Sequence, residues 1–315
     1  MFQPAGAKQF TILMTNLSIW LRGFAVRGVF WRLYLDWALA NLPFYLLPFC
    51  IWFWTLFFFF FAGPARRALV ANFFVMLPGS GLLSNYLRAW RTMYNYAWAI
   101  SEGTHYKLTR THFSYEIEGA DNLERLGAAR GAIGLTAHLG NYDLGAALFA
   151  EKFHREIRMV RAPEADQQTA EHLGQSLEQT GAGGVRVDYN RAENLLSFDL
   201  LHALRQGEII SIQGDRMIEG LARSSARFFG RETSFPTGPF ILARVARCEI
   251  FPLFIARTGY RKYRIIVREP ITVEQSDSKR DQDIALAIQQ WSAVLEGVLA
   301  RYWDQWYAFI PMFEK

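Results

Sequence analysis

A histidine and an aspartate five positions apart carry the chemistry that this sequence suggests. His138 follows a short apolar run that begins at Ala132, and Asp143 falls where a helical pattern starts. Gly140 and Asn141 supply turn residues between them, so we predict a strand, a tight turn and a helix start. The free N–H groups of a first helical turn favour a carboxylate, and from there Asp143 can reach back to His138. We predict that Asp143 fixes the imidazole tautomer so that His138 acts as a general base.

The same pair also fits a structural histidine satisfied by a local hydrogen bond. Whether His138 is catalytic or structural therefore depends on other parts of the chain. A second polar group, Gly214, Asp215 and Arg216, follows an apolar run at 208–213. The carboxyl ends of parallel strands are where open α/β sheets bind ligands. We predict that Arg216 binds a substrate phosphate or carboxylate through its fixed fork of donors, while Asp215 orients it or the acceptor hydroxyl. A solvent-exposed Asp–Arg pair at a strand end is the alternative.

A third group lies before a later apolar helix, in the run Pro-Thr-Gly-Pro at 236–239. It places Thr237 and Gly238 at the start of that helix, where unpaired N–H groups suit an anion or a developing oxyanion. A plain helix start that has no function is the alternative. Arg158 and Arg161, on the strand after the His–Asp helix, are further candidates for anion binding, and Asn141 is a candidate substrate ligand beside His138.

The elements that must position these residues alternate between short apolar runs and longer helical patterns, which is typical of an α/β fold with a mixed, mostly parallel sheet flanked by helices. The final two strands, separated by five residues, are expected to form an antiparallel hairpin, followed by a long helix over 281–302. The predicted strands are 113–117, 132–137, 157–161, 185–188, 209–213, 250–256 and 263–267.

The N-terminal part of the chain has a different composition. Residues 42–62 contain no charged side chain and match the ~20 residues needed to cross a bilayer. Two prolines interrupt this segment and arginines flank both sides, so the sequence leaves open whether it spans the bilayer or only embeds. We predict an interfacial helix and membrane anchor over residues 1–65 and a second domain over 66–315. Aromatic residues within 1–41 are spaced as in an interfacial amphipathic helix.

Charge and cysteine content indicate which classes of partner and which compartment to expect. The 315-residue chain has a formal net charge of +5 and a pI near 9.2. Basic residues near an anchor are attracted to anionic lipid, and an acidic carrier protein would be drawn to the same surface. No nucleic-acid motif is present, so nucleic acid is not an expected partner. The two cysteines offer neither a disulfide framework nor metal-ligand spacing, which fits a reducing compartment.

Taken together, these runs resemble one family. The block from His138 to Asp143 matches the HxxxxD motif of lysophospholipid acyltransferase-like enzymes, and the surrounding sequence is similar to the late (secondary) acyltransferases of lipid A biosynthesis. The resemblance covers nearly the whole chain from about Trp31. Arg216 stands where that branch usually has Gln, and Ala162 separates Arg161 from Pro163, so the acceptor can differ from lipid A. Further matches are Arg66-Arg67, Asn72, Leu77-Pro78, Gly214-Asp215, Phe229-Gly230, Pro236 to Pro239, Phe251-Pro252 and Asp304-Gln-Trp306.

The resemblance implies transfer of a fatty acyl group from acyl carrier protein, or from coenzyme A, to a hydroxyl of a membrane lipid, which is a lipid A-like molecule or another lysolipid or glycolipid. His138 would take the hydroxyl proton, Asp143 would balance its charge, and backbone N–H groups with Arg161 would stabilise the oxyanion. The resemblance further implies no metal, no bound cofactor, and a catalytic domain on the cytoplasmic face of the inner membrane.

Two alternatives remain open at this point. A lipid esterase or thioesterase could use the same pair with water, although the chain has no Gly-x-Ser-x-Gly motif. An inactive, membrane-anchored lipid-binding protein is the other alternative.

Overall fold

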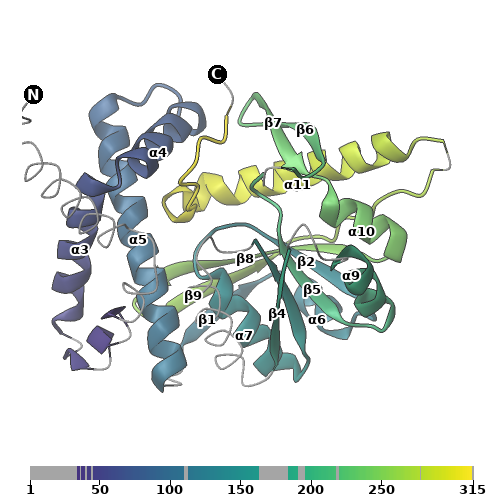
Figure 1. The fold of residues 1–315 in the computed structure, drawn as a ribbon, viewed down its shortest axis with the longest axis horizontal. Helices are drawn as coiled ribbons and strands as arrows, with labels where there is room; N and C mark the ends of the chain where they lie inside the picture. The colour runs from purple at the N-terminus through teal and green to yellow at the C-terminus, as the bar shows by residue number, and fades with distance from the viewer. Residues whose placement is uncertain are drawn as a thin grey trace, which may run out of the picture.

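A seven-stranded sheet forms the centre of the protein (Figure 1). The structure is a computed structural model, and it describes residues 34–313 except 36, 40, 44, 110–112, 163–183, 191–195, 218–219 and 277. The strand order is β1-β9-β8-β2-β5-β3-β4. Neighbouring strands are parallel except β8 and β9, which form the expected antiparallel hairpin. The mixed, mostly parallel α/β fold is therefore confirmed. The strands are β1 (Ser114–Glu118), β2 (Ala132–Thr136), β3 (Ile157–Arg161), β4 (Val185–Tyr189), β5 (Ile209–Gln213), β8 (Ile250–Gly259) and β9 (Lys262–Val267).

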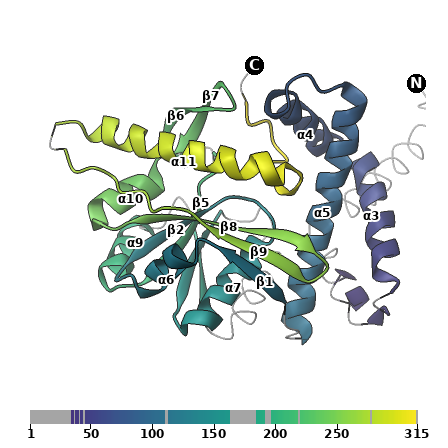
Figure 2. The same cartoon turned by 180° about the vertical axis from the view of Figure 1, so that it is seen from behind.

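Helices cover both faces of this sheet because its central strands are apolar on both sides. Along β2, Ala132 belongs to the core cluster that contains α6 (Ala120–Ala128) and α7 (Tyr142–Phe153). Ile133 and Leu135 belong to the opposite cluster. That second cluster includes α9 (Leu196–Arg205), α10 (Gly238–Ala246) and α11 (Arg280–Tyr302). Figure 2 shows α11 crossing one side of β8 and β9 while α6 lies on the other.

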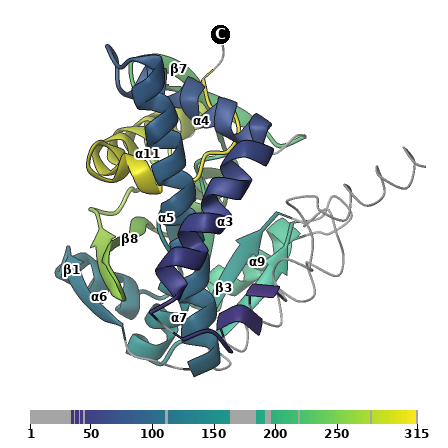
Figure 3. The same cartoon turned by 90° about the vertical axis from the view of Figure 1, so that its left-hand side faces the viewer.

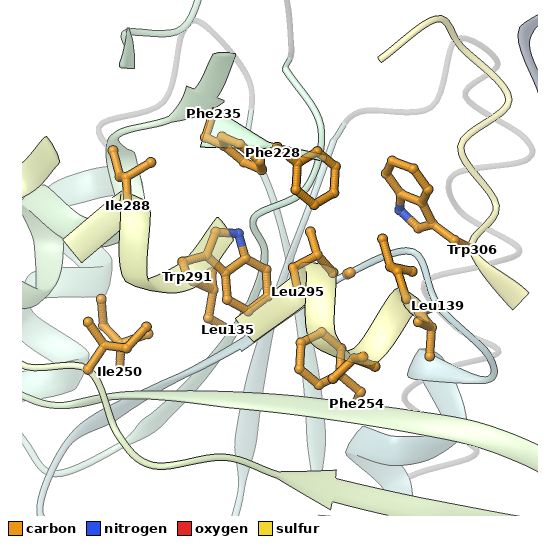
Figure 4. Packing of buried hydrophobic residues seen from close by; sticks show 14 of the residues in the cluster. Leu135, Leu139, Phe228, Phe235, Ile250, Phe254, Ile288, Trp291, Leu295 and Trp306 are labelled. Atoms are coloured by element: carbon orange, nitrogen blue, oxygen red, sulfur yellow. The ribbon is translucent and has the colours of Figure 1, made fainter. Parts of the chain in front are cut away.

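The larger core cluster is organised around Trp291 of α11. Its ring is fully buried and stacks on Phe254 of β8 with the ring centroids 5.6 Å apart. Figure 4 shows Trp291 and Leu295 between Phe254 and the phenyl rings of Phe228 and Phe235. The indole N–H of Trp291 donates to the carbonyl of Gly214 at 3.0 Å. This helix therefore supports the carboxyl end of β5, where the second polar group lies.

The phenyl rings of Phe228 and Phe235 come from a hairpin that the sequence analysis does not predict. β6 (Arg223–Phe228) and β7 (Arg231–Pro236) form a separate antiparallel pair. Only Ala226 and Phe228 are buried along β6, so its apolar pattern is too short to indicate a strand. The Ser292 hydroxyl of α11 donates to the carbonyl of Arg227 in β6. A side chain thus pairs with this edge backbone group, as a neighbouring strand otherwise would.

Among the described residues, the helices α3 (Leu47–Phe61), α4 (Gly63–Met76) and α5 (Leu82–Thr109) precede the sheet. Figure 3 shows α3 running alongside α5. Within the described ranges no single helix has the length and apolar character to cross a bilayer, whereas α3 and α4 meet those criteria as a pair bent by 90°. The anchor, and the division at residue 65, therefore stay predictions. The expected interfacial helix over 1–41 lies almost wholly outside the described residues.

Candidate active site

The site is built on the turn between β2 and α7. Gly140 has a φ of +59°, and a Cβ at this position would lie 1.8 Å from the carbonyl oxygen of Ile255. Only glycine fits both the left-handed backbone and the close approach to β8. The next residue, Asn141, caps α7 by accepting the N–H of Leu144 at 3.3 Å. The predicted strand, turn and helix start are thus confirmed, and they leave His138 at the carboxyl end of β2.

The carboxylate that holds His138 belongs to Asp215. Its Oδ1 lies 2.7 Å from His138 Nδ1, and its Oδ2 accepts the backbone N–H of His138 at 3.1 Å. The same Oδ2 accepts the indole N–H of Trp306 at 2.8 Å. Asp215 is fully buried and protein donors occupy both of its oxygens, so the structure places it against His138; that it also orients a substrate group stays a prediction. We refer to His138 and Asp215 as the dyad.

The electrostatics of the dyad fix the tautomer of His138. Burial alone would raise the pKa of Asp215, but the charge and hydrogen bond of His138, the charge of Arg216 and the Trp306 hydrogen bond hold this pKa well below its ordinary value. Asp215 is therefore ionised at neutral pH and can only accept. Nδ1 of His138 must then carry the proton. In the neutral ring Nε2 is then the nitrogen with the lone pair. It has no hydrogen bond from any described residue, and the His138 side chain is 19% exposed.

Asp143 contacts Arg161 and not His138, which was its predicted partner. Its Oδ1 lies 2.6 Å from Nη1 of Arg161, at the carboxyl end of β3, and the predicted bond from Asp143 to His138 is absent among the described contacts. An arginine is always charged, so its bond to a carboxylate joins two full opposite charges, whereas a neutral imidazole brings no charge of its own. Arg161 therefore holds Asp143, and Asp215 is left to hold His138.

Tyr142 contacts the dyad and is influenced by the charges of two arginines. Its ring centroid is 5.6 Å from that of His138, and the two rings meet edge to face. Burial and the neighbouring charge of Asp143 raise the pKa of Tyr142 well above its ordinary value, with Arg161 and Arg216 acting in the opposite sense. The charges of both guanidinium groups thus act on the Tyr142 hydroxyl. Arg216 donates to the carbonyl of Tyr307 through Nη2, while its buried Nε has no partner among the described residues.

This geometry agrees with a comparison of the chain with known families. Residues 82–315 match the family described as bacterial lipid A biosynthesis acyltransferase. The chain belongs to this family. No curated protein matches the chain. The matched range begins at the first residue of α5 and contains the dyad, both arginines beside Tyr142, and Trp306. The acyltransferase family thus points to an enzyme that moves an acyl group to a lipid.

Other residues that the sequence analysis assigns to substrate binding have structural partners in this acyltransferase. The Asn141 amide donates to the Ala99 carbonyl and to the Tyr263 hydroxyl in addition to capping α7, and 6% of its surface is exposed. Arg158 lies near the amino end of β3, where Asp188 holds it at 2.7 Å. Substrate binding by Asn141 and by Arg158 therefore stays a prediction, and the protein partners of both side chains were not visible in local sequence patterns.

The start of α10 is also not brought to the dyad by any described contact. Thr237 begins the helix as predicted, but its hydroxyl donates to the carbonyl of Ala222 and not to the helix. Its own carbonyl accepts the N–H groups of Phe240 and Ile241. Anion binding at Thr237 and Gly238 therefore stays a prediction.

Trp306 and Tyr307 both contact the dyad, although no role is predicted for them from the sequence. Trp306 donates to Asp215, and the N–H of Tyr307 donates to the carbonyl of His138 at 2.8 Å. The run Asp304-Gln-Trp306 was the available signal, since it is one of the matches to the family. Among the described residues, no group of three or more His, Cys, Asp or Glu side chains is placed to hold a metal ion.

Proposed function

We propose that this protein transfers a fatty acyl group from an acyl thioester, carried by acyl carrier protein, to a hydroxyl of a membrane lipid, with His138 as general base. The acceptor is a lipid A-like molecule or another lysolipid or glycolipid. The observation that carries this proposal is the contact of 2.7 Å between Asp215 and Nδ1 of His138, which directs Nε2 of the neutral ring away from Asp215, on a side chain that is partly exposed. A base in this state is what deprotonation of an alcohol requires.

The reaction needs no covalent enzyme intermediate. Nε2 of His138 takes the hydroxyl proton while the hydroxyl oxygen attacks the thioester carbonyl carbon. The tetrahedral intermediate then collapses, the carbon–sulfur bond breaks, and the leaving thiolate takes the proton back from Nε2. Asp215 stabilises the imidazolium in between, because its carboxylate faces Nδ1. Positioned general base catalysis of this kind contributes roughly 10²- to 10⁴-fold to the rate.

The negative charge that develops on the carbonyl oxygen needs its own partner. Arg161 and Arg216 both act on Tyr142, which contacts His138 edge to face. We infer that one of these guanidinium groups stabilises the oxyanion, a contribution of ~3 kcal/mol for a single donor. Asp143 would then serve the reaction by holding Arg161 in place, at 2.6 Å.

An apolar crevice next to the dyad supports an acyl substrate. It lies between α7 and the sheet. Tyr142 lines it at the end nearest His138, and Gly145, Phe149, Leu253 and Ile265 continue it along α7. Its apolar lining suits a hydrocarbon chain whose thioester stays at the dyad.

The N-terminal helices support a site at a membrane surface. The family resemblance, and not these helices, is the reason to propose the cytoplasmic face of the inner membrane. Phe49, Phe53 and Phe61 of α3 are 72%, 58% and 67% exposed, and Leu83 at the start of α5 is 75% exposed. Apolar side chains gathered on one outer face are typical of contact with a bilayer. Both substrates of the proposed reaction carry acyl chains that partition into lipid.

The proposal is tested with the purified full-length chain, a radiolabelled acyl carrier protein thioester, and vesicles with or without a lysolipid or lipid A precursor. We expect labelled lipid only when acceptor is present, and slower transfer from the coenzyme A thioester. Release of free fatty acid at the same rate without acceptor would support a thioesterase and contradict the proposal. Absence of turnover with every acceptor, together with tight binding to the vesicles, would support an inactive lipid-binding protein.

A further inference from the structure

The last described part of the chain lies across the dyad and ends against the N-terminal helices. We propose that residues 304–312, here called the strap, position the dyad, with Trp306 as the contact to Asp215 and Asn72 of α4 as the latch. Neither residue touches the reacting atoms, so both are positioning residues. The inference deepens the proposed function and rests on it only for the part that is measured as a rate.

At one end the strap contacts both members of the dyad and the turn between β2 and α7. Tyr307 donates its N–H to the carbonyl of His138 at 2.8 Å, and the N–H of Gly140 donates to the carbonyl of Gln305 at 3.0 Å. The indole of Trp306 reaches Asp215 Oδ2 at 2.8 Å. Figure 4 shows Trp306 beside Phe228 and close to Leu139, within the packed core. The strap thus fixes the backbone of His138 and the rotamer of its carboxylate partner at once.

The indole contact is a directional one. A carboxylate has two oxygens, and Asp215 must present Oδ1 to Nδ1 of His138. The bond from Trp306 to Oδ2 restrains rotation of the carboxylate about χ2, which is a soft torsion. Trp306 is 2% exposed, so water cannot replace its N–H if that donor is lost.

At the other end one side chain holds the strap by three bonds. Nδ2 of Asn72 donates to the carbonyls of Ala308 and Ile310 at 3.1 and 2.9 Å, and Oδ1 accepts the N–H of Met312 at 2.9 Å. Asn72 is 2% exposed, and both polar atoms of its side-chain amide bind the strap. Because α4 is one half of the bent helix pair that could enter a bilayer, the latch connects that pair to the dyad.

Helix α5 adds a second, weaker support. Nδ2 of Asn95 donates to the carbonyl of Asp304 at 2.9 Å, and Nε of Arg91 lies 2.7 Å from the Asp304 carboxylate. Arg91 is 63% exposed, so this ion pair contributes little by itself. The three hydrogen bonds of the buried Asn72 side chain therefore form most of the latch.

Two variants test the strap against matched controls. Trp306→Phe keeps an aromatic ring and removes the N–H, and its control is Trp303→Phe, because the Trp303 indole donates to no described residue. Asn72→Leu removes the latch amide, and its control is Asn85→Leu, a fully buried asparagine of α5 whose described bond goes to Arg88. All four are compared with the parent protein for kcat and KM toward the acyl donor. Amide hydrogen exchange at Tyr307 and Gly140 is measured on the same samples.

We expect Trp306→Phe to lower kcat about tenfold or more with KM changed less than about threefold, because a misplaced base slows chemistry more than binding. Asn72→Leu is expected to speed exchange at Tyr307 and Gly140 about tenfold while Asn85→Leu does not. Equal kcat in Trp306→Phe and Trp303→Phe would overturn the role of Trp306. Parent-like exchange in Asn72→Leu would overturn the latch.

The exchange measurement needs no turnover, so it decides the latch even if the parent protein transfers no acyl group and the proposed function fails. If Asn72→Leu does not unfold cooperatively, Asn72→Ser replaces it, since the shorter side chain cannot span the three strap groups.

Discussion

Asp215 lies directly opposite His138 in the register of the central sheet. Thr136 of β2 pairs with Gln213 of β5, so the residue two positions beyond each strand faces the other, and the two side chains meet at 2.7 Å. The 77 residues that separate them in sequence are brought together by parallel pairing of the two strands. The dyad is therefore a property of the sheet and not of the turn that carries His138.

The ion pair between Asp143 and Arg161 makes a prediction about coupling. Asp143→Ala and Arg161→Ala are each expected to remove most acyl transfer, and the double variant should lose little more than either single variant, because both act through one contact at 2.6 Å. The measurement is kcat/KM for the four proteins of this cycle. Additive losses would show that Asp143 acts on the reaction independently of Arg161.

The low pKa of Asp215 predicts a dependence of stability on pH. The folded protein keeps Asp215 ionised where the unfolded chain takes up a proton, below about pH 4. The stability contributed by this carboxylate is thus fully present above about pH 4 and is lost as pH falls further. Asp215→Asn should therefore lose less unfolding free energy between pH 4 and pH 2.5 than the parent protein, by about 1.4 kcal/mol per pH unit.

Denaturant unfolding at several pH values measures these slopes. Asp121→Asn, at an exposed position on α6, is the control. Parallel slopes for the parent protein and Asp215→Asn would show that folding does not change the proton affinity of Asp215.

The turn glycine makes a prediction about stability. Gly140→Ala places a Cβ against the Ile255 carbonyl in addition to a strained backbone, so we expect a loss of at least about 3 kcal/mol in unfolding free energy. Gly230 has a similar φ of +73° with open space around it, so Gly230→Ala should cost only about 1 kcal/mol. Chemical denaturation of both variants gives the comparison. Similar losses would mean that the backbone strain alone, and not the contact with β8, makes glycine necessary at 140.

The exposed aromatic face of α3 makes a prediction about membrane binding. Phe49→Ser should weaken partition of the protein into anionic vesicles roughly tenfold or more, since burying one phenyl ring contributes roughly 1.5–3 kcal/mol. Phe198 of α9 is similarly exposed, at 67% against 72%, and lies away from the N-terminal helices. Sedimentation with vesicles is therefore expected to show no change for Phe198→Ser. Equal effects of the two substitutions would remove the argument for α3 as the membrane contact.

Periodicity predicts the strands of the main sheet to within a few residues, because β2, β3 and β5 are apolar runs bounded by turn residues. It also places His138 and Asp215 at strand ends. It cannot pair them, since the order of strands in a sheet is set by packing of distant helices and not by local pattern. Asp143 was the nearest carboxylate in sequence, which is why the local prediction chose it. Trp306 and Asn72 both lie in the matches to the family, but those matches do not show their partners, which are 91 and 236 residues away in Asp215 and Ala308.

The most direct test of the dyad is the acyl transfer rate of Asp215→Asn beside that of His138→Ala, with the carrier-protein thioester and a lipid acceptor. An asparagine at 215 can no longer balance the imidazolium, so both variants should lose roughly 10²-fold or more in kcat while KM for the donor stays within about threefold. Both should also unfold cooperatively. Parental kcat in either variant would contradict a mechanism in which Asp215 holds His138 as the base.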